Sequence, residues 1–374
     1  MAAPIPTPLT IAQELVRRPS REEQGEQACA DYLRGLLEAA GFAVRAIDLA
    51  PGRPNLIATL PQAKPGPALA FSGHLDTVAL GQAPWSFEPC GGLVDGGRLL
   101  GRGASDMKAG VAAMVHAALR LAQGPAPRPN VALIFSAGEE HGLKGALHLA
   151  KTPGALPPVG AMLIGEPTAN QPLLGHKGGL WLGVEFTGKS AHASMPHLGD
   201  NAIDKAAAAI VALGGHRFAQ SHAVLGRPTL NVGLIRGGAA ANIVADHCRL
   251  DLDTRLLPGM DPEAVIAELR RVMGPQARVV SRNYLPPTWT EPDHPWVAAA
   301  LKLIAAQTGD RRPPGGAPYV TDASALGPAL GCPTLIIGPG EPGQAHQTDE
   351  WCQCERIDQA AEIYHQLALA WPMD

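Results

Sequence analysis

Short apolar runs alternate with helical patterns along the first part of the chain. Four such runs predict buried strands: 55–60 and 68–71, which are bounded by proline and glycine, and 131–135 and 161–164. Four stretches show helical periodicity: 11–18, 28–40, 107–122 and 143–150. Ser105 is expected to cap the third of these helices. Strands alternating with helices predict an α/β domain whose mostly parallel sheet is covered by helices on both faces.

The pattern changes after residue 177. Strands and helices are now predicted in the order strand, helix, strand, strand, helix, strand, at 179–187, 201–213, 229–235, 248–255, 261–273 and 278–284. This order predicts a small α+β sandwich with an antiparallel sheet. A helix at 295–307 and a strand at 333–337 return to the first pattern. We therefore predict one domain made of 1–177 and 287–374, interrupted by an inserted domain at 178–286.

Composition narrows the range of functions. The chain has 374 residues and a net charge of -4, with 46% hydrophobic and 17% charged residues. This balance favours a folded two-domain protein and gives no electrostatic sign of binding to nucleic acid or to a membrane surface. The N-terminal segment does not resemble a secretion signal, and the six cysteines are scattered. We therefore expect reduced thiols and a cytoplasmic location.

Polar side chains stand where the predicted elements of the first domain begin or end. They are His74, Asp76, Asp106, Glu139, Glu140, Glu166 and His346. Functional groups in open α/β sheets collect at the carboxyl ends of strands. The adjacent carboxylates Glu139 and Glu140 follow an apolar strand, where cations are needed to neutralise them. Two histidines and three carboxylates suit two zinc ions that share one carboxylate, and the same donors accept cobalt or manganese.

Each of these residues also has an ordinary structural explanation. His74 and Asp76 could simply hydrogen-bond within a polar loop. Asp106 could be a first-turn carboxylate favoured by the helix dipole. The metal-site hypothesis rests on the occurrence of such residues at five successive elements.

Four segments, in order and at suitable spacing, resemble the signature of one di-zinc family: 72–77 (SGHLDT), 103–108 (GASDMK), 138–140 (GEE) and 165–168 (GEPT). This metallopeptidase and deacylase family contains acetylornithine deacetylase, succinyl-diaminopimelate desuccinylase, aminoacylase and glutamate carboxypeptidase. The resemblance implies a catalytic α/β domain and an inserted lid domain through which the chain forms a homodimer. It also implies two Zn²⁺ per subunit.

The resemblance implies a role for each residue of the metal site. His74 and Glu166 would hold one zinc ion, Glu140 and His346 would hold the other, and Asp106 would bridge the two.

Two further residues would serve catalysis in the same domain. Asp76 would orient His74 by its carboxylate, and Glu139 would be the general base that moves a proton from water to the leaving amine.

The inserted domain adds three candidates through the same resemblance. His192, in the segment SAHASMP, would donate a hydrogen bond to the developing oxyanion in the partner subunit's site. Arg255 would bind a substrate carboxylate with its guanidinium fork, and Asn242 would make a polar contact to the substrate. Without the family, His192 would be read as a histidine satisfied beside a proline turn and Arg255 as a surface arginine.

Several segments most resemble acetylornithine deacetylase, among them 165–168, 176–178, 228–231 and 338–350. One segment differs from the pattern of that enzyme: residues 321–323 are Thr-Asp-Ala, where the enzyme tends to carry Thr-Glu-Ala. Asp322 is thus a candidate substrate contact. Because of this difference, the identity of the substrate's amino-acid side chain is not predicted. We predict hydrolysis of an N-acyl-L-amino acid, with a dipeptidase or glutamate-type carboxypeptidase as the alternative. The presence of Glu139 argues against a noncatalytic metal-binding protein, because the predicted base is not a metal ligand and such a protein would not need it.

Overall fold

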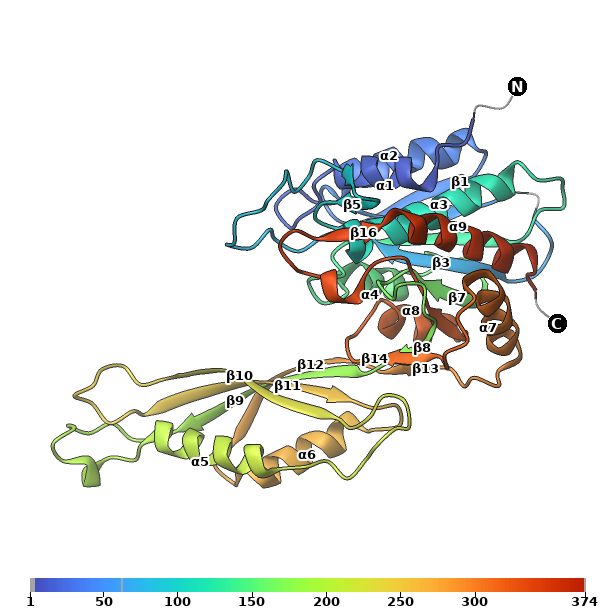
Figure 1. Cartoon of the computed structure of the whole chain (residues 1–374). Coiled ribbons are helices and arrows are strands. Elements are labelled where there is room, and N and C mark those ends of the chain that lie inside the picture. Colours follow the sequence, from blue (N-terminus) through green and yellow to red (C-terminus); the bar gives the residue numbers. More distant parts are fainter. Residues whose placement is uncertain (1–3, 62, 373–374) are drawn as a thin grey trace. The chain divides into compact units, whose positions relative to one another are not determined.

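The chain forms two compact units in the computed structural model, which describes residues 4–61 and 63–372 (Figure 1). The second unit comprises His176–Thr288 and Gly316–Val320. The remaining described residues form the first unit. The segment 316–320 lies in the second unit, whereas the expected boundaries put it in the first.

The first unit is built on a mixed sheet. Its strands follow the order β1 (Ala43–Ala50), β2 (Arg53–Thr59), β6 (Val131–Ser136), β3 (Ala68–His74), β7 (Val159–Ile164), β15 (Thr334–Ile336), β8 (Leu173–His176) and β13 (Thr288–Trp289), with β14 (Gly315–Ala317) also paired to β8. The central strands β6, β3, β7 and β15 run parallel. Antiparallel pairs lie outside them, such as β1 with β2 and β8 with β15.

Helices cover both faces of this sheet (Figure 1). One face carries α1 (Pro8–Val16), α2 (Gln27–Ala39), α3 (Ala109–Ala122), α9 (Cys354–Leu369) and α7 (Pro295–Thr308), which packs against α9, and the other carries α4 (Lys144–Lys151) and α8 (Ala323–Leu330). Both β3 and β6 are buried along their whole length because they lie between these layers. The α/β prediction is confirmed.

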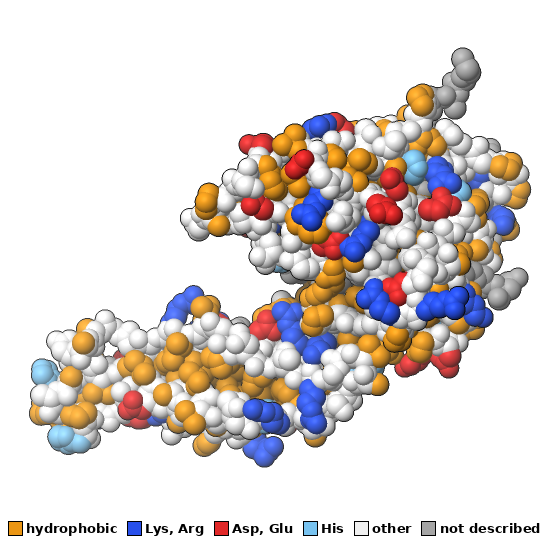
Figure 2. All heavy atoms as spheres, viewed as in Figure 1, with side chains coloured by type: hydrophobic (Ala, Val, Ile, Leu, Met, Phe, Trp, Pro, Cys, Tyr) orange, Lys and Arg blue, Asp and Glu red, His pale blue; other side chains and the backbone are white. Residues whose placement is uncertain are grey.

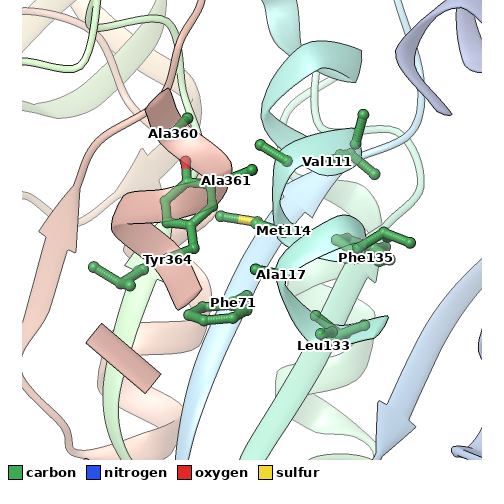
Figure 3. Close-up of a cluster of buried hydrophobic side chains, with 14 of the residues drawn as sticks. Phe71, Val111, Met114, Ala117, Leu133, Phe135, Ala360, Ala361 and Tyr364 are labelled. Carbon is green, nitrogen blue, oxygen red and sulfur yellow. The ribbon is translucent and has the colours of Figure 1, made fainter. Parts of the chain in front are cut away.

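The core beneath α3 and α9 brings distant segments together (Figure 3). Phe71 of β3 packs against Tyr364 of α9, with ring centroids 5.6 Å apart, and Met114 of α3 belongs to the same cluster. The hydroxyl of Tyr364 donates a hydrogen bond of 2.6 Å to the carbonyl oxygen of Ile337. This packing holds the strand ends that carry the candidate site against the helices.

The second unit has the predicted sandwich order. Its antiparallel sheet follows β10 (Thr229–Gly237), β11 (His247–Leu256), β9 (Gly178–Thr187) and β12 (Arg278–Leu285), packed with α5 (Ala202–Gly215) and α6 (Pro262–Met273). Buried and partly exposed residues alternate along β11. Leucines such as Leu252 are therefore buried, while Asp253 and Arg255 lie on the opposite, open face.

Two details differ from the sequence-based expectation. The helix expected from residue 107 begins at Ala109, after a π-helical turn at Ala104–Lys108. The prediction that Ser105 caps it was wrong, because the Ser105 hydroxyl donates 2.7 Å to the carbonyl oxygen of Trp351. The sequence analysis also missed α9 and the three-stranded sheet of β16 (Trp351–Gln353), β5 (Arg98–Leu100) and β4 (Leu93–Asp95). Within the described residues, no helix combines the length and the apolar character needed to span a membrane.

Candidate metal centre and active site

Three of the predicted metal ligands meet at one edge of the central sheet. His74, Asp106 and Glu140 each place a ligand atom within 4.8 Å of the others. His74 ends β3, and it pairs in register with Ser136 at the end of the parallel strand β6. Glu140 follows β6, and Asp106 lies in the turn before α3. Parallel strands thus bring residues far apart in sequence to one site.

The Asp106 carboxylate lies between two imidazoles. Its Oδ1 is 3.1 Å from Nε2 of His74, and its Oδ2 is 3.5 Å from Nε2 of His346. The same His346 nitrogen is 2.9 Å from Oε2 of Glu140. The His346 side chain is 55% exposed, whereas that of His74 is 1% exposed. This arrangement matches a bridging carboxylate with one buried and one accessible imidazole.

Acidic groups crowd this edge. Burial raises the pKa of Glu166 well above its ordinary value, and the charges of Asp106 and Glu140 add to the effect. Burial likewise raises the pKa of Glu139 well above its ordinary value, with neighbouring carboxylates contributing. Burial opposes protonation of His74, but its hydrogen bond to Asp106 and the surrounding carboxylates raise its pKa well above the ordinary value.

The raised pKa values of these groups indicate which ligand the site can bind. Several carboxylates held close together stabilise bound protons, and divalent cations would supply the same neutralisation. The donors are imidazole nitrogens and carboxylate oxygens without thiolate, a set that suits zinc and also cobalt or manganese. His74, Asp106 and Glu140 therefore fit a metal ion, and Glu166 and His346 lie close enough to act on the pKa of these groups.

Asp76 is fully buried and contacts His74 differently from the expectation. Its backbone carbonyl oxygen lies 3.0 Å from Nδ1 of His74, whereas its nearest carboxylate oxygen is 3.6 Å away. The carboxylate instead accepts the backbone N–H groups of Glu139 at 3.0 Å and Glu140 at 3.1 Å. Asp76 therefore holds the loop that carries the predicted base.

Two side chains that the sequence analysis missed hold the start of this loop. The N–H of Ala137 donates 2.9 Å to the side chain of Asn55, and that of Gly138 donates 3.1 Å to Glu26. Glu26 is buried and ion-paired with Arg53 at 2.7 Å. A polar Asn55 at the start of the apolar run of β2 was a signal of this role, but no motif marks Glu26.

Asp322 lies in the first unit and is 1% exposed. It accepts a short hydrogen bond from the hydroxyl of Ser136 at the end of β6. Burial raises its pKa to about 6. Its predicted contact with the substrate remains a prediction.

His192 and Asn242 come together in the second unit. Residue His192 pairs with Ile243 in an isolated bridge, and the N–H of Ala193 donates 3.1 Å to the carbonyl oxygen of Asn242. Nδ1 of His192 accepts the backbone N–H of Ser194 at 3.2 Å. The same nitrogen lies 2.7 Å from the hydroxyl oxygen of Ser194, so the polar contacts of the ring within this loop are made through Nδ1. Both His192 and Asn242 are exposed.

Arg255 is already paired in this structure. It donates to both carboxylate oxygens of Asp253, at 2.8 and 3.0 Å, through Nε and one terminal nitrogen. Its guanidinium also lies 5.2 Å from the ring centroid of Trp181, whose indole N–H donates 3.0 Å to Asp253. These contacts hold the arginine in a defined orientation.

Comparison with known proteins places the chain in a family. Residues 70–370 match the model of peptidase family M20/M25/M40. The chain is 32% identical over 387 aligned positions to an acetylornithine deacetylase of Proteus mirabilis, an alignment that covers 97% of this chain and 96% of that protein. The chain belongs to peptidase family M20/M25/M40, which confirms the resemblance seen in its motifs. The prediction of an enzyme that is an amidohydrolase or peptidase is confirmed with it.

Solved structures share the fold. A metallo-carboxypeptidase of the M20 family from Sulfolobus solfataricus aligns with a TM-score of 0.80 at 21% identity, covering 99% of this chain and 100% of that one. An aminopeptidase from Bacillus cereus aligns with a TM-score of 0.78 at 25% identity, covering 96% of each chain.

Metal removal should destabilise the protein, and more so at alkaline pH. The pKa values of Glu139 and Glu166 are raised in the fold, so without metal the folded state binds protons more tightly than the unfolded state. The metal-free protein should then lose stability as pH rises through those raised values. The drop in Tm caused by a chelator should be larger at about pH 8 than at about pH 6. Equal Tm values with and without chelator at both pH values would contradict a metal at this site.

Proposed function

We propose that the chain hydrolyses the amide bond of an N-acyl-L-amino acid, as an acetylornithine deacetylase or a succinyl-diaminopimelate desuccinylase does. The observation that carries this proposal is the Asp106 carboxylate between two imidazoles, with Glu139 beside them. The 32% identity to an acetylornithine deacetylase along nearly the whole chain supports the deacylase reading.

We assign the metal ligands as the family resemblance implies. In this assignment His74 and Glu166 would hold one zinc ion, Glu140 and His346 would hold the second, and the Asp106 carboxylate would be shared between the two. When bound, such ions lower the pKa of water and polarise an amide carbonyl. The observed contacts of Asp106 with both histidines support this assignment.

Glu139 acts as general base in this proposal. A carboxylate whose pKa is raised can accept a proton from the attacking water and hold it until the leaving amine takes it. The Glu139 backbone is anchored by Asp76, which keeps the carboxylate at the site. The other role that we propose for Asp76 is to orient His74, through the carbonyl contact at Nδ1.

The second unit is proposed to serve as a lid and a dimerisation domain. Hydrophobic side chains gather on its visible face (Figure 2). Strand β10 lies at the edge of the sheet, and Leu234 and Ile235 on it are about half exposed. An edge strand with exposed apolar side chains offers a surface for pairing with a second copy. His192 of one subunit would then donate Nε2–H to the oxyanion in the partner's site.

Replacement of His192 tests both the donor and the dimer. His192→Ala should lower kcat about 100- to 1,000-fold, the usual loss for one oxyanion donor. His197→Ala, a nearby exposed histidine, is the matched control and should keep wild-type kcat. Mixing His192→Ala with Glu139→Gln protein should restore activity, because mixed dimers contain one complete site. No loss in His192→Ala, or no recovery on mixing, would remove the donor or its action across subunits.

Arg255→Lys should weaken substrates that carry an α-carboxylate, because the planar fork of donors is lost. We expect KM to rise about tenfold or more, which corresponds to the loss of one charge-assisted hydrogen bond. Arg249→Lys is the matched control, since Arg249 forms the same kind of pair with Asp251 on the same strand. Equal kcat/KM on substrates with and without the carboxylate would contradict this role.

A substrate screen decides between the deacylase and peptidase activities. N-acetyl, N-succinyl and N-formyl amino acids test the deacylase, and dipeptides with peptides ending in glutamate test the alternative of a dipeptidase or carboxypeptidase. The peptidase fold of the structural relatives supports keeping that alternative.

Asn242 and Asp322 remain proposed substrate contacts. A cytoplasmic location also remains proposed, and the six free cysteines are compatible with it.

A further inference from the structure

A buried glutamate outside the predicted ligand set gathers the backbone around Asp106. The side chain of Glu350 is 1% exposed. Its Oε2 accepts the N–H of Gly103 at 2.9 Å, and its Oε1 accepts the N–H groups of Ser105 at 2.8 Å and Asp106 at 3.0 Å. One carboxylate therefore binds three backbone donors of the short turn that presents Asp106.

A buried arginine completes this arrangement. Arg102 pairs with Oε2 of Glu350 at 2.7 Å. It also donates to the carbonyl oxygens of Gln347 at 3.1 Å and Ala79 at 3.2 Å. The pair thus joins the Asp106 turn, the segment after His346 and the loop after β3.

The chain order gives this contact a particular consequence. Glu350 follows His346 by four residues, so the segment that presents one imidazole also holds the turn that presents the central carboxylate. An ionised carboxylate can accept all four of these hydrogen bonds, and bonds to a charged acceptor are the strong ones. A glutamine side chain would direct its NH₂ group at one set of donors and lose that set.

We propose that Glu350 is a positioning residue, which sets Asp106 and His346 relative to each other so that both can hold a divalent ion. This inference rests on the proposed metal site. Residues that orient metal ligands commonly affect metal affinity and turnover without touching the substrate. Glu350 therefore acts through Asp106 and His346.

The test is a calorimetric titration of metal-free protein with Zn²⁺ alone. Glu350→Gln should bind Zn²⁺ about 10- to 100-fold more weakly than wild type. At saturating metal its kcat should remain reduced while KM stays unchanged, and the visible spectrum of the Co²⁺ form should differ from wild type. Glu341→Gln is the matched control, because Glu341 lies in the same loop between β15 and β16 but its side chain pairs with Arg356 of α9. The control should keep wild-type affinity.

A second variant covers the case in which Glu350→Gln does not fold. Glu350→Asp keeps the charge beside Arg102, but it is one methylene too short to reach the three backbone donors. It should fold and still bind Zn²⁺ more weakly than wild type. Wild-type affinity, kcat and Co²⁺ spectrum in a folded Glu350 variant would overturn the inference. Failure of wild-type protein to bind Zn²⁺ would overturn the proposed metal site itself, and this inference with it.

Discussion

Glu139→Gln should remove most of the turnover while the protein keeps its bound metal. Glutamine has nearly the shape of glutamate but cannot accept the proton of the attacking water. The expected fall in kcat is about 100- to 10,000-fold, the range that a positioned general base contributes. Steady-state kinetics on the best substrate of the screen, together with elemental analysis of metal content, provide the measurement.

The reason to expect retained metal lies in the anchoring of this residue. Asp76 binds the backbone N–H of Glu139, so the substitution leaves that hydrogen bond and the adjacent Glu140 in place. Glu23→Gln is a suitable control because Glu23 is exposed and paired with Arg21 away from the metal cluster. If Glu139→Gln turned over at the wild-type rate, Glu139 would not be the base.

Asp106→Asn should lose metal and activity together. In the structure the two carboxylate oxygens approach different imidazoles, those of His74 and His346. An amide offers one acceptor oxygen and turns NH₂ donors toward the other side, and it removes the negative charge that balances the cations. We expect metal affinity to fall by more than about 100-fold, the upper end of the loss for residues that merely support ligands.

Metal content after dialysis and the residual kcat measure this effect. Asp204→Asn, at an exposed aspartate in the first turn of α5, is the control and should retain both. An Asp106→Asn protein that kept its full metal content and wild-type kcat would show that this carboxylate bridges nothing.

The candidate ligands could be picked out from the sequence because they lie at the ends of predicted strands and helices. His74 closes β3, and Glu140 follows β6; parallel neighbouring strands place such ends at one edge of a sheet. The inserted sandwich could be predicted for a similar reason, since each of its strands and helices has a clear periodicity. The turn before α3 was misread because Ser105 looks like a helix cap, whereas its hydroxyl is used by Trp351.

The residues that hold the loops could not be predicted from local pattern. Glu26 lies 112 positions before Gly138, whose N–H it accepts, and Glu350 lies 247 positions after Gly103. A buried carboxylate that accepts backbone donors needs no particular sequence around it, only the right place in the folded chain. The pairing of Arg255 with Asp253 is different, because the two residues are neighbours on one face of β11 and the alternation along the strand puts them there.

The most direct test of the account is the release of free amine from N-acetylornithine and the other N-acyl amino acids of the screen, before and after metal removal. We predict hydrolysis of at least one N-acyl-L-amino acid, loss of that activity with a chelator, and its return with zinc or cobalt. Metal-loaded protein that binds zinc but hydrolyses dipeptides and none of the N-acyl amino acids would contradict the proposed deacylase. Hydrolysis unaffected by complete metal removal would contradict the metal mechanism.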